Sequence, residues 1–565
     1  MLYPQTNAYR HVYNLNGIWN FAMVPDDYVP RAPLENARPM AVPASMNEIF
    51  TQRGERDYMG KVLYEREFSV PQDKTSEYRL RLGAVSHKCE IYINGRLAGK
   101  GDSGFYPVDI ALPRLREKNV LSVLIDNRLD FSTLPPGRIE DGRQTINFDF
   151  FNYTGIHRDV LLYTRPPKPI EDIAVHTVAG GDYGKIRVDV QTDGKIVALT
   201  VKDANGNAVA SASGGEIRVP APRLWSPDDP YLYTLDVTTE TDAYEQTFGI
   251  RKVSFDATGL FLNDKRVYLQ GFGMHEDFAL LGKGNNAAVN VRDFELLRWI
   301  GANSIRTSHY PYSEEIMDLA DRYGIMVIDE VPAVGMNAFR GGNNFAPDRL
   351  NETTEKLHKQ LITALMARDK NHPCVVMLSV ANEPATEEEG ARAYFQNVIA
   401  HARTVTDLPI TLAEVTKLEQ NSRVADLVDF TALNRYYGWY EEHGNLYRTQ
   451  PLLTEELQGW HRKYGKPVIV TEFGADTVEG THALPAETFS EEYQTEFLEE
   501  NCRVLDTLPF VAGEHVWNFA DFKTKQGVIR VRGNRKGVFT RERQPKAAAF
   551  FLKKRWHAKK EQKEQ

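Results

Sequence analysis

Short runs in which apolar and polar residues alternate fill the chain from about residue 10 to residue 255. Residues 91–93 read Ile-Tyr-Ile before Asn94-Gly95, and residues 199–201 read Leu-Thr-Val ahead of Asn205-Gly206. Asn-Gly is typical of a type I′ hairpin turn, because both central residues of that turn need positive φ. The period of two predicts strands joined by tight turns. This half of the chain is therefore predicted to be all-β.

The pattern of residues changes at two places along the chain. Residues 164–172 contain Pro166, Pro167 and Pro169, which cannot donate to a sheet ladder. This segment is predicted to link two β modules. Near Leu260 the alternating runs give way to apolar segments separated by helical patterns.

Eight apolar segments follow Leu260, and each is predicted to be a strand. A helix pattern ending at Gly324, and another over 490–505 that begins at the N-cap Ser490, lie between them. Eight strand–helix units in about 300 residues fit a (β/α)₈ barrel, whose active site lies at the carboxyl ends of the strands. The predicted strands are Val267–Gly271, Asn303–Arg306, Ile325–Ile328, Val375–Val380, Ile410–Leu412, Phe430–Leu433, Val468–Thr471 and Val511–Trp517.

Two glutamates come directly after predicted barrel strands. Glu383 follows the fourth strand and Glu472 follows the seventh. One such residue could simply cap a helix or pair with a lysine. Two carboxylates are what glycosidic cleavage needs: one protonates the leaving oxygen, and the other attacks the anomeric carbon or activates water.

Composition narrows the class of protein. The 565 residues are 42% hydrophobic and 26% charged, which is typical of a folded chain of several domains. The net charge of −9 disfavours a nucleic-acid partner. No apolar run approaches a membrane span, so no membrane partner is expected. The three cysteines, Cys89, Cys374 and Cys502, have no paired spacing, so they are expected to be reduced and mostly buried, in the cytoplasm.

The metal and cofactor alternatives are weak. His275-Glu276-Asp277 and Asp329-Glu330 offer ligand types but lack metal-site spacing, and Gly271-Phe272-Gly273 lacks the third glycine of a dinucleotide loop. No metal and no cofactor are therefore expected.

Several segments resemble the signatures of glycoside hydrolase family 2. Their order along the chain and their places at strand ends make the resemblance specific, and it covers nearly the whole chain. The segments are Asn382-Glu383-Pro384, Thr471-Glu472-Phe473-Gly474, Ile328-Asp329-Glu330, residues 306–311 and residues 149–158. Within the family, residues 434–440, 517–522 and 533–537 are similar to motifs of its β-glucuronidases.

The resemblance implies a retaining double displacement that hydrolyses β-D-glucuronides. Glu472 would be the nucleophile and Glu383 the general acid and then base, with carboxyl groups about 5–5.5 Å apart. Glu383 would hold its proton near neutral pH, and donors around Glu472 would keep it ionised. Tyr436 would bind and steady Glu472, although it could also be a core aromatic residue.

The same resemblance implies a substrate-binding set. Asn382 would bind the sugar 2-hydroxyl, His309 and Asp149 other hydroxyls, and Trp517 the ring, although His309 and Trp517 could be structural. A glucuronide carries a carboxylate at C6, which needs a cation and a hydrogen-bond donor. That site is expected to comprise Asn534 and Lys536, with Arg530 and Tyr440 nearby.

The implied architecture has three domains. Residues 1–166 are expected to form a jelly-roll-like β-sandwich, residues 167–256 an immunoglobulin-like β-sandwich, and residues 257–565 a (β/α)₈ TIM barrel. The partners implied are a small-molecule or oligosaccharide glucuronide and further copies of the chain in a homotetramer. Residues 332–355, after Glu330, differ from several relatives, which leaves the size of the substrate open.

Two rival functions remain. A family 2 β-galactosidase or β-mannosidase would act on neutral sugars, which the basic triplet 534–536 disfavours. A non-catalytic carbohydrate-binding protein would suit the large β half, but the presence of both Glu383 and Glu472 argues against it.

Overall fold

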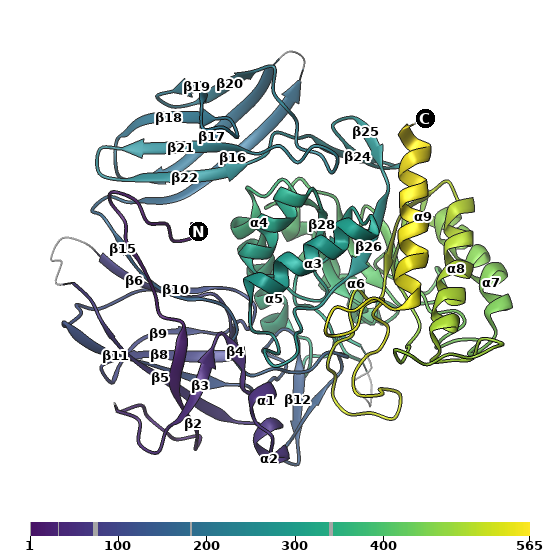
Figure 1. The fold of residues 1–565 in the computed structure, drawn as a ribbon, viewed down its shortest axis with the longest axis horizontal. Coiled ribbons are helices and arrows are strands. Elements are labelled where there is room, and N and C mark those ends of the chain that lie inside the picture. Colours follow the sequence, from purple (N-terminus) through teal and green to yellow (C-terminus); the bar gives the residue numbers. More distant parts are fainter. Residues whose placement is uncertain (1, 32, 72–76, 181–182, 338–342, 565) are drawn as a thin grey trace.

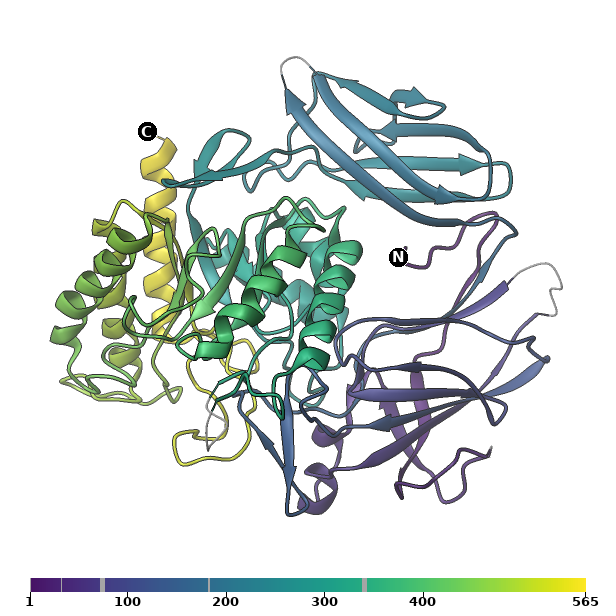
Figure 2. The same ribbon diagram turned by 180° about the vertical axis from the view of Figure 1, so that it is seen from behind.

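Two β-sandwiches flank a barrel in the computed structural model, which describes residues 2–31, 33–71, 77–180, 183–337 and 343–564. In Figure 1 the N-terminal sandwich lies below, the second sandwich lies above, and the barrel lies beside both. The view from behind shows the same arrangement (Figure 2). The expected fold class, two β-sandwiches followed by a TIM barrel, is confirmed.

The first sandwich packs an antiparallel sheet in the order β3-β2-β5-β11-β8-β9 against the sheet β1-β15-β6-β10. Its core contains Tyr64, Ile91 and Leu121, each almost fully buried. Two short sheets, β4-β14-β7 and β12-β13, complete it. Its elements are β1 Val12–Asn14, β2 Gly17–Val24, β3 Arg38–Val42, β4 Ala44–Ser45, α1 Met46–Ile49, α2 Arg53–Arg56, β5 Lys61–Ser69, β6 Glu77–Leu82, β7 Val85–Ser86, β8 Lys88–Ile93, β9 Arg96–Gly101, β10 Val108–Ala111, β11 Lys118–Asp126, β12 Gly137–Glu140, β13 Arg143–Ile146, β14 Gly155–Ile156 and β15 Val160–Arg165.

The second sandwich pairs the sheet β16-β17-β20 with the sheet β19-β18-β21-β22. Pro166, Pro167 and Pro169 all lie between β15 and β16, so the linker is shorter than predicted but keeps every proline outside a strand. A third sheet, β23-β24-β25, leads into the barrel. The strands are β16 Ile170–Gly180, β17 Tyr183–Thr192, β18 Ile196–Lys202, β19 Ala208–Ala212, β20 Glu216–Pro220, β21 Tyr233–Thr239, β22 Ala243–Phe248, β23 Val253–Asp256, β24 Gly259–Leu262 and β25 Lys265–Val267.

One of the two predicted Asn-Gly turns is confirmed and the other is wrong. Asn94 and Gly95 have φ of 52° and 75° and join β8 to β9, as a type I′ turn requires. Between β18 and β19 only Gly206 has positive φ, at 83°. The side chain of Asp203 accepts hydrogen bonds there from the backbone N–H groups of Asn205 and Asn207, at 2.9 and 2.8 Å, and so holds a five-residue loop instead.

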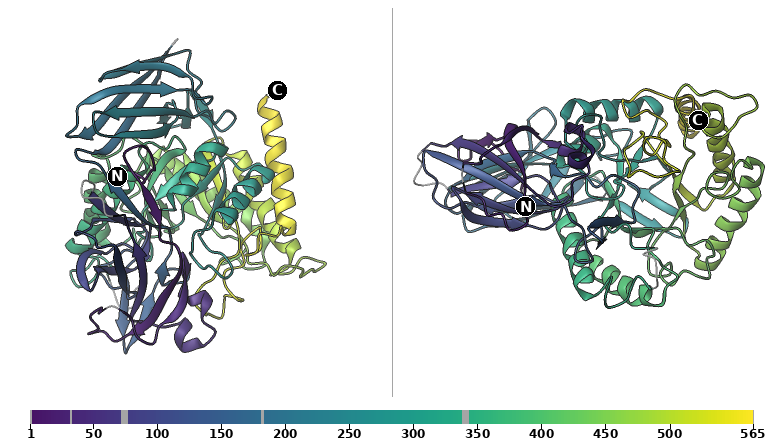
Figure 3. Two further views of the ribbon diagram at one scale, coloured as in Figure 1. Left: turned by 60° about the vertical axis from the view of Figure 1, so that its left-hand side comes forward. Right: turned by 90° about the horizontal axis from the view of Figure 1, so that it is seen from below.

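The barrel closes in the order β26-β27-β28-β29-β30-β31-β32-β33, with every neighbouring pair parallel. Helices surround it as a ring in the view from below (Figure 3, right). All eight predicted strands are confirmed. The elements are β26 Leu269–Gly273, α3 Ala287–Ile300, β27 Ser304–Arg306, α4 Glu314–Tyr323, β28 Met326–Glu330, α5 Glu352–Asp369, β29 Val375–Asn382, α6 Glu389–Ala402, β30 Ile410–Glu414, β31 Thr431–Asn434, η1 Leu446–Arg448, α7 Thr449–Tyr464, β32 Val468–Phe473, α8 Glu491–Thr507, β33 Val511–Val516 and α9 Ala547–Glu564.

The predicted helix caps are confirmed. Gly324 ends α4 with a φ of 70°, the left-handed conformation that glycine tolerates. Ser490 begins α8, and its side chain accepts a hydrogen bond from the N–H of Tyr493. These caps fix where the chain leaves each helix to enter the next strand or loop.

The two sandwiches contact opposite ends of the barrel. The indole of Trp225, from the second sandwich, donates to the carbonyl of Asp321 near the amino end of the strands. The first sandwich meets the other end, where Arg158 pairs with Glu276 at 3.0 Å. The first sandwich can therefore supply side chains to a site at the carboxyl ends of the strands.

The three cysteines Cys89, Cys374 and Cys502 are buried and free, as predicted. Among the residues that the structure describes, no helix is both long and apolar enough to cross a membrane.

Candidate active site

The two predicted glutamates lie at the carboxyl ends of barrel strands. Glu383 directly follows β29, and Glu472 is the fifth residue of β32. Tyr436 follows β31, His309 follows β27 and Trp517 follows β33. Because parallel barrel strands all end at one face, these five residues come from distant parts of the chain to one rim.

Glu472 is 4% exposed and is held by a ring of donors. Its Oε2 accepts the phenolic hydrogen of Tyr436 at 2.7 Å, and its Oε1 pairs with the guanidinium of Arg306. His309 places Nε2 3.7 Å from the same Oε1. A carboxylate between these groups is oriented and electrostatically stabilised.

Arg306 is fixed in turn by Glu330. Glu330 Oε2 accepts from Arg306 at 2.7 Å and from the hydroxyl of Ser379 at 2.6 Å, and its Oε1 contacts Nδ1 of His309 at 2.9 Å. Burial alone would raise the pKa of Glu330, but Arg306 and His309 lower it to about 2. Glu330 is therefore a permanent anion that orients both Arg306 and His309.

The carboxyl group of Glu383 accepts from the amide of Asn434 instead of from a cation. Its Oε1 accepts from Nδ2 of Asn434 at 2.9 Å, and the same amide contacts Oδ1 of Asn382 at 3.1 Å. Arg306 also donates to Asn382 Oδ1, at 3.3 Å. The backbone of Glu383 has a φ of 49°, a left-handed conformation that costs about 1–3 kcal/mol in a residue with a side chain. Such strain is characteristic of functional positions.

Both glutamates bind their protons more tightly than usual. Burial raises the pKa of Glu383. Burial also raises the pKa of Glu472 to about 8, because the nearby charge of Glu383 adds to burial while Arg306 and Tyr436 oppose it. Near neutral pH the pair therefore shares a proton. The donors around Glu472 favour its charge, so the proton belongs on Glu383.

Trp517 forms an aromatic wall with the neighbouring histidine. Its ring stacks on His309 with centroids 5.0 Å apart and an interplanar angle of 20°. His275 meets the edge of the same ring at 5.4 Å, and its Nδ1 contacts the hydroxyl of Tyr310. Burial lowers the pKa of His309 and of His275. The wall is therefore aromatic, with histidines that favour their neutral form, and it offers a flat surface against which a sugar ring can pack.

Lys536 lies fully buried at the other end of the site. Its ammonium group pairs with Asp476 and donates to the hydroxyl of Tyr440 at 2.9 Å. It also lies 5.2 Å from the centre of the Trp439 ring. Asp476 itself accepts from the N–H of Arg535 at 2.7 Å. A buried lysine held in this way presents a fixed positive charge.

Asp149 brings the first sandwich into this end of the site. Its carboxylate accepts from Nε of Arg530 at 2.9 and 3.1 Å and from Nδ2 of Asn534 at 2.8 Å. Arg530 also donates to the hydroxyl of Tyr440 at 2.6 Å. The predicted residues Asp149, Arg530, Asn534, Lys536 and Tyr440 thus form one connected network.

Tyr436 and Tyr440 connect the two halves of the site. Their ring centroids lie 4.9 Å apart in an edge-on arrangement. Tyr436 reaches Glu472, and Tyr440 reaches Lys536 and Arg530. The carboxyl pair and the cationic end are therefore neighbouring parts of one site.

The prediction from sequence omitted four residues that shape the site. Arg306 and Glu330 lie within the segments that resemble family 2, but the sequence assigned neither of them a role. Arg306 is the last residue of a predicted strand, and Glu330 lies two residues after the end of the next one. Asn434 ends β31 and so carried the same signal. Asp476 lies in the loop after β32, and its only sequence signal was its position four residues after Glu472.

The stretch after Glu330 also borders the site. Asn337 donates through its side chain to the carbonyl of Glu383 at 2.6 Å, and Val334 forms a bridge with Asn382. Residues 338–342, in the middle of the stretch expected to shape the substrate entrance, lie outside the described residues.

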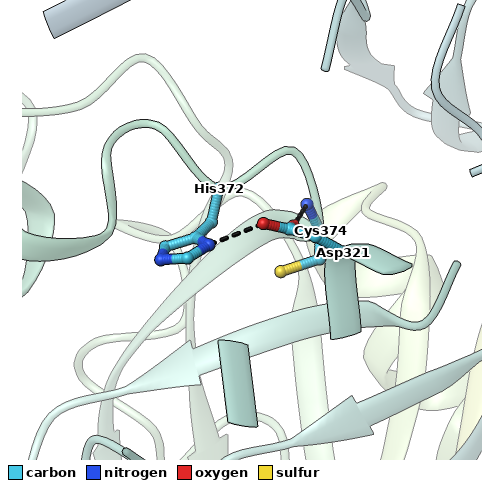
Figure 4. A group of neighbouring side chains, drawn as sticks. All are labelled: Asp321, His372 and Cys374. Atoms are coloured by element: carbon cyan, nitrogen blue, oxygen red, sulfur yellow. Dashed lines mark hydrogen bonds and ion pairs between the residues drawn. The ribbon is translucent and has the colours of Figure 1, made fainter. Parts of the chain in front are cut away.

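One group of possible metal ligands, Asp321, His372 and Cys374, occurs among the described residues, and it does not fit a metal ion (Figure 4). Oδ2 of Asp321 already contacts Nδ1 of His372 at 2.6 Å, and Oδ1 accepts from the N–H of Cys374 at 2.9 Å. Burial raises the pKa of the Cys374 thiol, whereas a metal binds the thiolate. His372 and Cys374 directly precede β29 and Asp321 lies near the end of α4, so the group is at the opposite end of β29 from Glu383.

Comparisons with known proteins agree along the whole chain. The description "Glycosyl hydrolases family 2, TIM barrel domain" matches residues 253–560, the family's sugar binding domain matches residues 12–166, and "Glycosyl hydrolases family 2" matches residues 169–251. A beta-glucuronidase of Paenibacillus borealis is 42% identical, over 98% of each chain.

Solved structures are similar over the same length. A beta-glucuronidase from an uncultured Clostridium sp. is 44% identical with a TM-score of 0.96, and covers 99% of this chain and 100% of its own. The beta-glucuronidase of Ruminococcus gnavus in complex with D-glucaro 1,5-lactone is 38% identical with a TM-score of 0.93, over 98% and 99%. The chain belongs to glycosyl hydrolase family 2.

Proposed function

We propose that this enzyme is a retaining β-glucuronidase, which hydrolyses β-D-glucuronides to D-glucuronate and the free aglycone. The observation that carries the proposal is the buried ammonium of Lys536, which shares Tyr440 with Arg530 beside the carboxyl pair. A neutral sugar has no use for two cations at that end. The β-glucuronidase names of relatives at 38–44% identity support the same substrate.

The first step forms a glycosyl-enzyme intermediate. Glu472 attacks the anomeric carbon while Glu383 passes its proton to the glycosidic oxygen, so the bond to the aglycone breaks. The donors Arg306 and Tyr436 favour a charged Glu472, and the amide of Asn434 leaves Glu383 free to hold the proton. In the second step Glu383 removes a proton from water, which releases the sugar from Glu472. The two carboxyl groups should lie about 5–5.5 Å apart.

The substrate contacts are assigned from hydrogen-bond donors whose hydrogens are not used within the protein. The hydroxyl of Tyr440 accepts from both Arg530 and Lys536, so its own hydrogen remains available to the substrate carboxylate. We assign Asn534 and Lys536 to that carboxylate as well. Asp149 and His309 bind sugar hydroxyls, Asn382 binds the 2-hydroxyl, and Trp517 lies against the ring.

Three further proposals concern the chain as a whole. We propose the domain division 1–166, 167–256 and 257–565. We also propose a cytoplasmic location, which the three buried free thiols support because they suit a reducing compartment. The assembly is a homotetramer, which light scattering of the purified chain will test.

The activity is tested with matched chromogenic substrates. The 4-nitrophenyl β-D-glucuronide should be cleaved far faster than the β-D-galactoside and β-D-mannoside. Faster cleavage of a neutral glycoside would overturn the assignment. No cleavage of any of them by the folded chain would favour the carbohydrate-binding alternative.

A further inference from the structure

A second cavity adjoins the active site without being part of it. Its volume is about 700 Å³, and it lies between α2 with its following loop, the segment 144–152 and the loop 523–533 that follows β33. Its lining does not include the active-site residues Glu383, Glu472, Trp517 and Lys536. Cavities of about 300–1,000 Å³ hold small-molecule ligands.

The cavity is strongly basic, although the protein is acidic overall. Its lining includes six cationic side chains and one carboxylate, Asp57. The chain as a whole carries −9. Concave surfaces of one sign concentrate the field and attract ligands of the opposite charge. The cations are Arg53, Arg56, Lys523, Lys525, Arg530 and Arg532.

Two of these cations have no carboxylate partner. Arg56 pairs with Asp57, and Lys523 pairs with Glu48 at 2.7 Å. Lys525 donates to a neutral group, the carbonyl of Ile146, at 2.8 Å. Among the described residues, no carboxylate lies within 4 Å of the charged groups of Lys525 and Arg532. Both are exposed, so their charges remain available to a ligand.

The cavity also offers a surface for a ring. Tyr58, Met59, Ile146 and Phe151 all line it. Lys523 lies over the face of Phe151, 4.7 Å from its centre. A ring can therefore lie on these apolar groups while an anionic substituent reaches the cations. Phosphate and sulfate esters suit several cations at once, because each presents three acceptor oxygens.

We propose that this cavity is a binding site, separate from the sugar site, for a small ring compound that carries a phosphate or sulfate group. Arg530 connects the two sites, because it lines the cavity and also contacts Asp149 and Tyr440. A bound anion competes with Asp149 for this guanidinium. Occupancy should therefore raise the KM for a glucuronide while leaving kcat nearly unchanged. Binding itself does not depend on the proposed β-glucuronidase activity.

Isothermal titration of the full chain with phenyl phosphate, phenyl sulfate and phenol tests the proposal. At least one of the two esters should bind saturably, and which of them binds identifies the preferred anion, whereas phenol should not bind. The double variant Lys525→Ala/Arg532→Ala should weaken binding at least about tenfold, because it removes two charge-assisted contacts. Raised salt should weaken it further.

Two control variants separate this cavity from other sites. Arg187→Ala/Lys195→Ala removes two exposed cations of the second sandwich and should leave binding unchanged. Lys536→Met alters the sugar site and should also leave it unchanged. The proposal is overturned if neither ester binds, or if binding survives Lys525→Ala/Arg532→Ala but is lost in Lys536→Met. A cooperative urea unfolding transition will show that each variant compared is folded under the conditions of the titration.

Discussion

Tyr436 donates its phenolic hydrogen to Glu472 Oε2 at 2.7 Å, while the other oxygen of Glu472 pairs with Arg306. The two donors come from different strand ends, so both oxygens of the carboxylate are held from opposite sides of the barrel. In a double displacement the charge on Glu472 is lost when the covalent bond forms and returns when it breaks. A donor on each oxygen therefore affects the energy of this charge both when the covalent bond forms and when it breaks.

Replacing Tyr436 with Phe should lower kcat about 10²-fold with little change in KM, because one preorganised donor to the reacting group is lost. Steady-state kinetics with 4-nitrophenyl β-D-glucuronide will measure both constants. The matched control is Tyr437→Phe, since that hydroxyl contacts Glu456 at 2.9 Å instead of Glu472. Equal effects of the two substitutions would show that Tyr436 does not act through Glu472.

Replacing Glu383 with Gln removes the proposed general acid and base while keeping the contact with Asn434 sterically possible. We expect kcat to fall about 10²–10⁴-fold with a poor leaving group, and less with a nitrophenyl group, which departs without a proton. Azide should restore turnover with the activated substrate, because it attacks the intermediate without a general base. The product should be the β-azide.

The control for that prediction is Glu387→Gln, in the loop that follows the same strand, where the side chain accepts a hydrogen bond from the hydroxyl of Thr416 at 3.1 Å. A loss that is independent of the leaving group and insensitive to azide would refute the role of Glu383. In that case the proton would come from another group of the site.

The fold could be predicted from sequence because its signals are local. Several barrel strands contain continuous apolar runs, which is what burial on both faces requires; residues 326–328, 375–378 and 468–470 are examples. Ser490 and Gly324 mark helix ends through bonds within a few residues. The turn at Asn205-Gly206 was mispredicted because the Asp203 side chain captured the nearby N–H groups, and this competition is decided by geometry.

The pairing inside the site could not be predicted in the same way. Strand ends marked Glu383, Glu472 and Tyr436, since position after an apolar run is visible in a sequence. The contact of Arg306 with Glu472 spans 166 positions, and that of Lys536 with Asp476 spans 60. No periodicity specifies which charges meet over such distances. Glu472 and Asp476, the acidic partners of Arg306 and Lys536, could therefore not be paired with them from the sequence.

Replacing Lys536 with Met should lower kcat/KM for the glucuronide about 10²–10⁴-fold, since the buried cation that we propose contacts the substrate carboxylate is lost. Residual activity on a β-galactoside should change much less. The substitution also leaves Asp476 buried without its partner, at a cost of about 3–5 kcal/mol in the free energy of unfolding. Urea unfolding and kinetics will be measured on the same samples.

The double variant Lys536→Met/Asp476→Asn separates stability from specificity. It should recover most of the lost stability, because no charge is left unpaired, and should remain poor on the glucuronide. Recovery of glucuronide turnover together with stability would show that Lys536 serves the fold and not the substrate.

The proton shared by Glu383 and Glu472 makes a prediction about stability against pH. The folded protein binds this proton more tightly than the unfolded chain, because burial raises the pKa of both carboxyl groups. The stability gained from protonation is complete below the unfolded pKa and is lost as pH rises through the folded pKa. Wild type should therefore lose a few kcal/mol of stability relative to Glu383→Gln/Glu472→Gln as the pH rises from about 5 to about 8. Urea unfolding at several pH values will measure the difference. The exposed Glu496→Gln should track wild type throughout, and a difference between wild type and Glu383→Gln/Glu472→Gln that stays constant with pH would contradict the raised pKa values.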